Sequence, residues 1–277
     1  MKPLKEENEK FPNAVQAFLL FVALCLAEYV ISAALWDARR VVELSQSELV
    51  VMVMVLGNGI LLSGILHFKK QTYKDLIHPS RRSMTATAAL LIPPVLLLVP
   101  GLLLLMCTAM DELVRWFPMS ASEEAMFARM AELDLPMVLA ICVLAPVVEE
   151  MLFRGVVLRS FLLQYSRRNA IVGSALLFGF AHMNLYQFCA AVVLGLLSGW
   201  LYERARSLIP CIALHAAYNS ALVLWGWQER ATPASSWTAT VSWQVWLVAG
   251  LAGVCGASWL TALLTHRRSA GVRVDSA

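Results

Sequence analysis

Residues 135 to 163 read LPMVLAICVLAPVVEEMLFRGVVLRSFLL, an apolar run long enough to cross a membrane as one helix. A bilayer core of roughly 30 Å needs about 20 helical residues. Near the middle of the run stand two acids, Glu149 and Glu150, and a base, Arg154, where lipid would favour hydrocarbon. Ionisable side chains at this depth are costly, so they usually face a bundle interior or a wet cavity and carry function.

The rest of the chain is equally apolar, with 59% hydrophobic residues, 15% charged residues and a mean hydropathy of +0.67. This exceeds the apolar share of soluble domains. Backbone polar groups in lipid must be satisfied within each segment, and no segment alternates as barrel strands do. We therefore expect an all-α, polytopic integral membrane protein with about eight transmembrane helices. The expected spans are residues 14–36, 48–68, 84–110, 135–163, 169–183, 186–204, 207–227 and 243–265.

The distribution of Lys and Arg predicts the orientation in the membrane. With the N-terminus inside, the inner segments hold 16 of the 22 Lys and Arg residues and the outer segments hold five. Cytoplasmic loops are enriched in these residues, so both termini are expected to be cytoplasmic. The first span is expected to be retained, because its apolar run exceeds a typical signal-peptide core and Glu28 interrupts it. No basic arm or stripe indicates nucleic acid as a partner.

One outer segment, residues 119–134, has a helix signature of its own. Ser120 and Glu123 have the spacing of a capping box. Apolar residues then recur at helical spacing, which predicts a short helix lying in the outer interface. A solvated acidic loop with one helical turn is the alternative.

Helical spacing separates the roles of the two neighbouring glutamates. Glu150 and Arg154 are four residues apart, so they lie on one face and are expected to form an ion pair that offsets part of their desolvation. Glu149 is turned by about 100° from Glu150 and lacks that partner. A partly desolvated carboxylate without a partner is a usable base.

Polar residues of two later spans converge on the same depth. The fourth and fifth spans are joined by a turn around Ser166, with Glu150 sixteen residues before it and His182 sixteen residues after it. Both would lie about 24 Å from the turn, so they are expected to meet. His215 and Asn219 share a face of the seventh span. Two acids, two histidines and an amide on three helices favour a reactive site over separate structural residues.

Three further residues allow two interpretations each. Phe178 lies four residues before His182 and either walls the cavity or packs in the core. Glu28 and Asn58 are deep polar residues of the first two spans. We interpret them as helix-packing or hydration residues, because nothing near them in the sequence completes a reactive set.

Three motifs together resemble those of a known family. EEMLFR at residues 149–154 resembles E-E-x-x-x-R, FGFAH at 178–182 resembles F-x-x-x-H, and HAAYN at 215–219 resembles H-x-x-x-N of the CAAX protease and bacteriocin-processing family. These intramembrane endopeptidases are similar to the CAAX prenyl endopeptidase. The resemblance covers the fourth to seventh spans. It implies three parts: N-terminal transmembrane helices and loops (1–134), a catalytic core (135–227), and a C-terminal transmembrane helix with a cytoplasmic tail (228–277).

The resemblance also implies a role for each matching residue. Glu149 and His182 would activate the attacking water, and His215 and Asn219 would stabilise the oxyanion. Arg154 and Glu150 would support the site. Peptide hydrolysis needs both a base and oxyanion donors.

The residues alone do not decide whether a metal ion takes part in the chemistry. Glu150, His182 and His215 with a water could form a three-ligand catalytic zinc site. Against this, no H-E-x-x-H spacing places two histidines on one helix face. We expect that no cofactor is required, with zinc as the alternative.

The expected partners are a peptide or membrane-anchored protein substrate and the lipid bilayer. The resemblance and the positive-inside pattern predict a multi-pass protein of the bacterial plasma (inner) membrane. Two other functions remain possible: a proton-coupled transporter in which the same acids and histidines relay protons, and a non-catalytic immunity or scaffold protein. Inverted repeats in the sequence would favour a transporter, and the sequence displays none.

Overall fold

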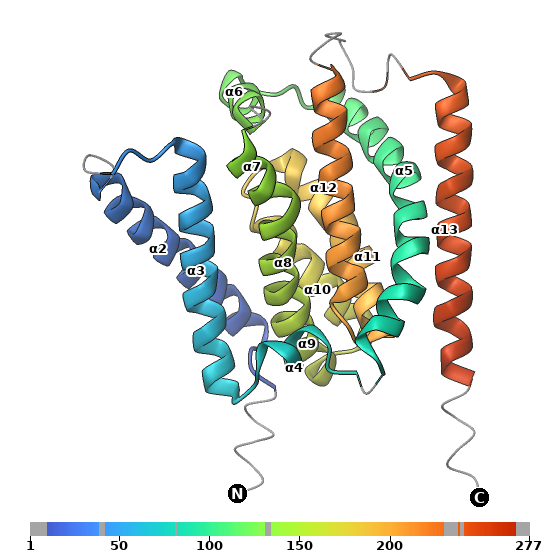
Figure 1. Cartoon of the computed structure of the whole chain (residues 1–277), viewed down its shortest axis with the longest axis horizontal. Coiled ribbons are helices and arrows are strands. Elements are labelled where there is room, and N and C mark those ends of the chain that lie inside the picture. The colour runs from blue at the N-terminus through green and yellow to red at the C-terminus, as the bar shows by residue number, and fades with distance from the viewer. Residues whose placement is uncertain are drawn as a thin grey trace, which may run out of the picture.

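The computed structural model describes residues 10–38, 42–80, 82–130, 134–229, 238 and 241–269. Every regular element among these residues is a helix (Figure 1), so the all-α prediction is confirmed. The elements are α2 (Ala14–Ala38), α3 (Gln46–Lys69), α4 (Tyr73–Ile77), α5 (Met84–Trp116), α6 (Ala121–Met130), α7 (Leu135–Leu139), η1 (Ala140–Leu144), α8 (Ala145–Glu150), η2 (Met151–Leu158), α9 (Arg159–Gln164), α10 (Arg167–Phe180), α11 (Leu185–Ala205), α12 (Ile209–Glu229) and α13 (Trp243–Ser269).

The prediction of eight spanning helices needs one correction. Within the described residues, seven helices are long and apolar enough to cross a membrane, and they include the continuous stretch from α7 to α9. The predicted fifth span is α10, which has only 14 residues. At 1.5 Å per residue it rises about 21 Å, short of the bilayer core of roughly 30 Å. It ends at Phe180, and His182 lies in the turn that follows.

Side-chain caps fix several helix starts. Ser45 and Glu48 form a capping box at the start of α3. The Ser166 hydroxyl accepts from the backbone N–H of Asn169, which begins α10 at the predicted turn. Before α6, the Ser120 hydroxyl accepts from the Glu123 N–H at 3.3 Å, and the Glu123 carboxylate accepts from the Ser120 N–H at 2.8 Å. The predicted capping box and helix are thus confirmed. The Ser120 hydroxyl, which donates to Glu123 Oε2 at 2.7 Å, and the Ser120 N–H together hold the pKa of the Glu123 carboxyl below its ordinary value.

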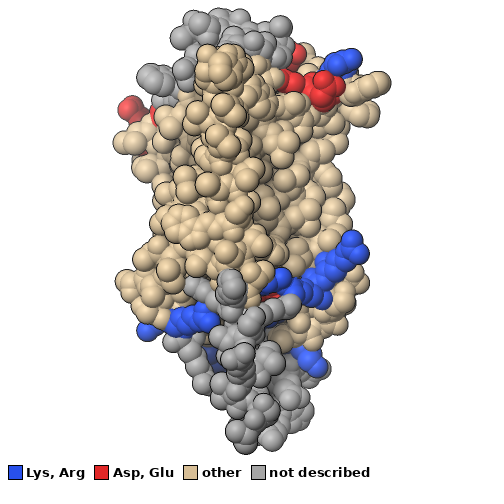
Figure 2. All heavy atoms as spheres, turned by 90° about the vertical axis from the view of Figure 1, so that its right-hand side faces the viewer, with Lys and Arg blue, Asp and Glu red and all other residues tan. Residues whose placement is uncertain are grey.

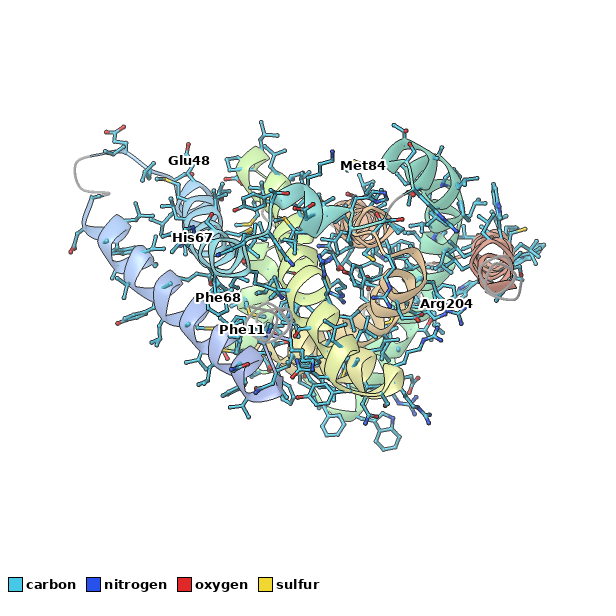
Figure 3. All side chains as sticks on the ribbon, turned by 90° about the horizontal axis from the view of Figure 1, so that it is seen from below. Phe11, Glu48, His67, Phe68, Met84 and Arg204 are labelled. Atoms are coloured by element: carbon cyan, nitrogen blue, oxygen red, sulfur yellow. The ribbon has the colours of Figure 1, made fainter. Side chains whose placement is uncertain are left out.

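The helices form a central bundle with one flanking group on either side. In Figure 1, the hairpin of α2 and α3 lies to the left of the bundle, and α13 lies on the right beside α5. Seen from below (Figure 3), Phe11 lies beside Phe68 of α3, with ring centroids 5.2 Å apart. The hairpin packs on the bundle mainly through α3, against α7 and η1. Between α2 and the bundle lies a cavity, which is described with the site below.

Charged side chains gather at the two ends of the molecule. In Figure 2, most Lys and Arg atoms in view lie near the lower end, whereas the Asp and Glu atoms in view lie mainly near the upper end. A broad band without charged side chains separates them. Such a band is what the apolar core of a bilayer requires of a surface that faces it.

Candidate active site

The two adjacent glutamates lie between two π-helical segments of one membrane-spanning helix. The segment η1 precedes them, and η2 begins directly after Glu150. In η1 the Ala145 N–H bonds to the Ala140 carbonyl, five residues back. The next residue, Pro146, has no N–H, so the Ile141 carbonyl gains no partner from the following π turn. The wider π turns and this carbonyl therefore determine the backbone geometry on either side of Glu149 and Glu150.

Asn219 of α12 satisfies that carbonyl. Its Nδ2 donates to the Ile141 oxygen at 2.9 Å, so it links α12 to η1. The family resemblance implies that Asn219 is an oxyanion donor, and that role stays a prediction. The amide nitrogen carries two N–H groups, so one bond to the backbone leaves a second that can donate elsewhere. Proline within an apolar helix is the sequence signal that marks such an unpaired carbonyl.

A double-mutant cycle tests this link. Asn219→Ala is expected to destabilise the fold by about 1 to 3 kcal/mol, because it leaves the Ile141 carbonyl without a partner. Pro146→Ala supplies an N–H that can bond to that carbonyl, so the Asn219→Ala substitution should cost less in its presence. Unfolding in detergent micelles measures all four proteins. Equal costs of Asn219→Ala with and without Pro146 would show that the two residues do not act on one carbonyl.

Glu150 is the centre of a buried polar cluster. Its Oε1 lies 3.1 Å from Arg154 Nη1, which confirms the ion pair predicted from their spacing. The same oxygen lies 3.0 Å from Nδ1 of His215. All three residues are buried. A carboxylate oxygen accepts, so Nδ1 of His215 carries a proton and directs Nε2 away from Glu150.

The Phe178 ring connects this cluster to the second histidine. The Arg154 guanidinium lies over the ring face at 4.4 Å from its centroid. His182 and His215 meet the ring at near-perpendicular angles, with centroids 5.2 and 5.6 Å away. None of the three guanidinium nitrogens of Arg154 has a hydrogen-bond partner among the described residues. The ion pair with Glu150 and the ring face of Phe178 therefore supply the stabilisation of this cation. The contacts show that Phe178 lies between the functional groups as well as in the core.

Glu149 lies outside the buried cluster and faces a cavity. Its side chain is 29% exposed to solvent, and its Oε2 lies 3.7 Å from Nε2 of His215. That distance is too long for a direct hydrogen bond. One water about 2.8 Å from each atom would bond to both of them. The contrast with Glu150 follows the predicted difference between a partnered and an unpartnered carboxylate.

His182 faces the same cavity from the turn after α10. Its Nδ1 lies 3.0 Å from the Phe178 carbonyl, which can only accept, so Nδ1 carries the proton. In the neutral ring Nε2 is then an acceptor. The sequence predicts that His182 meets Glu150. In the structure the described polar contacts of Glu150 go to Arg154 and His215 instead. His182 shares the cavity with the neighbouring Glu149.

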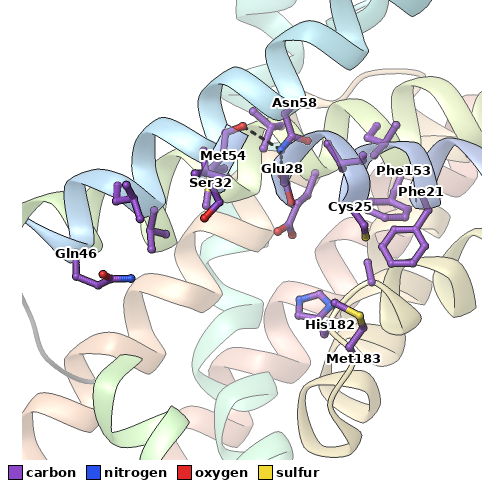
Figure 4. Close-up of a pocket in the computed structure, with 18 residues that line it drawn as sticks. Phe21, Cys25, Glu28, Ser32, Gln46, Met54, Asn58, Phe153, His182 and Met183 are labelled. Carbon is purple, nitrogen blue, oxygen red and sulfur yellow. Dashed lines mark hydrogen bonds between the residues drawn. The ribbon is translucent and has the colours of Figure 1, made fainter. Parts of the chain in front are cut away.

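The cavity has a volume of about 360 Å³ and lies between the α2–α3 hairpin and the bundle. Figure 4 shows His182 and Glu28 lining it from opposite elements, with Asn58 bonded to Glu28. Its size falls in the range of ligand pockets. Glu28 and Asn58 do make the expected contact between helices. Sequence spacing could not show that Glu28 also borders the cavity that holds Glu149, because the two residues lie on different helices.

The residues named as a zinc set do not fit a metal ion in this arrangement. Oε1 of Glu150 is already bonded to Arg154 and to His215. Nδ1 of His215 carries a proton in its bond to Glu150, and Nδ1 of His182 carries one in its bond to the Phe178 carbonyl, so each histidine offers only Nε2. Glu150 offers only Oε2, which has no hydrogen-bond partner among the described residues. Among the residues that the structure describes, no group of three His, Cys, Asp or Glu side chains could hold a metal ion. Chemistry without a metal stays a prediction.

Comparison with known proteins bears on the family. Residues 131–221 match the model of the Rce1-like type II CAAX prenyl endopeptidases. No curated protein and no solved structure matches the chain. The matched segment contains all three motifs, and the seven apolar helices agree with a membrane protease. The family predicted from the motifs, the CAAX protease family, is therefore confirmed for residues 131–221.

Proposed function

We propose that the protein is an intramembrane endopeptidase that hydrolyses a peptide bond in a membrane-associated peptide or protein. The observation that carries the proposal is the approach of Glu149 Oε2 to His215 Nε2 at 3.7 Å, beside a cavity that His182 also lines. A carboxylate and one imidazole that line the cavity, with a second imidazole 3.7 Å from the carboxylate, are groups that can activate water for attack on a carbonyl.

The first step is the attack of water. Glu149 accepts a proton from the water, and the resulting oxygen nucleophile forms a C–O bond with the scissile carbonyl carbon. Nε2 of His182 is an acceptor in the neutral ring, so it orients the same water. A partly shielded carboxylate does this work better than one in bulk water, because fewer solvent molecules compete for its lone pairs.

The second step is stabilisation and collapse of the tetrahedral intermediate. Its oxyanion accepts from Nε2–H of His215 in the imidazolium form and from the second N–H of Asn219. The Glu150 carboxylate, 3.0 Å from Nδ1 of His215, accepts from Nδ1–H and so orients the ring with Nε2 away from Glu150. Arg154 in turn holds Glu150 in place. Glu149 then passes its proton to the leaving nitrogen as the C–N bond breaks, which gives a carboxylic acid and an amine.

The setting of the reaction is the plasma membrane of a bacterium, with both chain termini in the cytoplasm. In this orientation the short helix α10 together with the turn after it makes one pass, so the number of passes is even. The excess of Lys and Arg in the segments assigned to the inside supports this orientation. Most Lys and Arg atoms in view in Figure 2 lie near the lower end of the molecule, at which α3 and α13 finish (Figures 1 and 2).

A proteome comparison tests the function. In cells that carry the intact protein, the Glu149→Gln protein or the His182→Ala protein, one precursor is expected to accumulate with both variants and to disappear with the intact chain. Mass spectrometry of membrane and secreted fractions measures it. Each variant must be present in the membrane at the intact level.

Two other outcomes would replace the proposal. Identical precursor patterns together with proton-dependent uptake into vesicles would indicate a transporter. An immunity phenotype that survives loss of both Glu149 and His215 would indicate a non-catalytic binding protein.

A further inference from the structure

Glu28 of α2 lines the cavity, and neighbouring residues of α3 fix the position of its side chain. Its Oε1 accepts from Nδ2 of Asn58 at 3.1 Å. The same Nδ2 donates to the Met54 carbonyl at 3.1 Å, and Asn58 is only 5% exposed. Because both N–H groups of this amide are used, its orientation is fixed, and it holds the Glu28 carboxylate at a defined place (Figure 4).

A glycine makes room for the same side chain. A Cβ added to Gly57 would lie 2.6 Å from Cγ of Glu28, closer than real contacts allow. The stem of Glu28 therefore lies directly on the α3 backbone. A buried amide on one side and a missing side chain on the other position this carboxylate better than a chance contact between helices would.

The cavity has an unbalanced charge. Glu28 and Glu149 both line it, and none of its described lining residues is Lys or Arg. The cation of the site, Arg154, is bonded to Glu150 and does not line the cavity. Two carboxylates that line one cavity repel each other, and a cation placed between them offsets that repulsion.

Most of the remaining lining residues are apolar, and the polar ones besides the two glutamates are Ser32, Gln46, Asn58 and His182. A peptide in the cavity would lie against aliphatic and aromatic side chains, with Glu28 as its charged contact and Glu149 beside the scissile bond. The apolar lining residues include Phe21, Leu24, Leu49, Val53, Leu152 and Phe153.

We propose that Glu28 is a specificity-determining residue that selects a substrate with a Lys or Arg side chain close to the scissile bond, within an otherwise apolar segment. The proposal rests on the proposed endopeptidase function and names its substrate class. A carboxylate at this place also disfavours a substrate whose own carboxylate would enter the cavity, because like charges would then meet at low dielectric.

A native thiol allows the charge of the cavity to be measured without any cleavage. Cys25 lines the cavity and lies three residues before Glu28, on the same helix face. The full-length protein in lipid nanodiscs is treated with two matched methanethiosulfonates, one carrying a trimethylammonium group and one a sulfonate. Mass spectrometry of the peptide that contains Cys25 gives the two labelling rates. Both rates depend equally on the intrinsic reactivity of the thiol, so the ratio of the two rates reports the charge around Cys25.

We expect the cationic reagent to label Cys25 about tenfold faster than the anionic one, because each carboxylate attracts one and repels the other. Glu28→Gln should remove most of this preference, and Glu28→Arg should reverse it. Glu112→Gln, the same change at an exposed position, should leave it unaltered. An unchanged ratio in Glu28→Gln, or no labelling by either reagent, would overturn the proposal.

Cleavage profiles test the substrate class itself. The intact protein and Glu28→Gln are given the same peptide library in detergent micelles, and the cleaved bonds are sequenced. Sites of the intact protein should be enriched in Lys or Arg at one fixed position, and Glu28→Gln should lose this enrichment. Cleavage with identical profiles would refute the role of Glu28 and leave the protease intact. If Glu149→Gln cleaves like the intact protein, the proposed function fails instead.

Discussion

Replacement of Glu149 by Gln is expected to lower the rate of peptide cleavage by about 10²- to 10⁴-fold, the usual contribution of a positioned general base. Gln has nearly the same shape as Glu, so the packing around α8 should persist. It cannot accept a proton from water, although its carbonyl can still orient one. Single-turnover assays with a cleaved peptide measure the chemical step, and substrate binding should change little.

The matched control is Glu112→Gln, which makes the same chemical change at an exposed residue of α5. It should retain the full rate. Turnover by Glu149→Gln at the intact rate would remove Glu149 from the mechanism. A loss of rate that follows a loss of folded protein would count against a catalytic role, so thermal unfolding is measured on the same samples.

The sequence predicts the helical class well because its signal is local. Long apolar runs demand helices in lipid, and seven of the eight expected spans have the required length. The exception, α10, shows the limit of this signal. Hydropathy rates the residues after Phe180 as a continuation of the span, but they form the turn that carries His182. After this turn the chain contacts other elements, which hydropathy does not register: the Tyr186 hydroxyl donates to the Phe117 carbonyl, and Asn184 donates to Glu123.

Contacts within one helix were predictable at the site, and contacts between helices were not. The Glu150–Arg154 ion pair follows from a spacing of four residues. The position of His215 between the two glutamates depends on how α12 packs against α8. The bond from Asn219 to Ile141 depends in addition on the π turn before Pro146, and no residue pattern in the sequence specifies that turn.

The buried ion pair should have the largest effect on stability. Glu150 and Arg154 are 0% and 1% exposed, so each charge depends on the other. Arg154→Met or Glu150→Leu alone leaves one buried group without its partner, and each should lower the free energy of unfolding by about 3 to 5 kcal/mol. Titration with SDS in mixed micelles measures the loss. Removal of Arg115 from the exposed Glu112–Arg115 pair is the control, and it should cost less than about 1 kcal/mol.

The double variant Glu150→Leu/Arg154→Met separates stability from function. With both charges gone, apolar side chains of similar volume fill the space, so most of the lost stability should return. Cleavage should not return, because Nδ1 of His215 then lacks the carboxylate that fixes the orientation of its ring. A double variant as unstable as either single one would show that the pair is needed for the fold beyond charge balance. A double variant that cleaves at the intact rate would show that neither Glu150 nor Arg154 supports the oxyanion site.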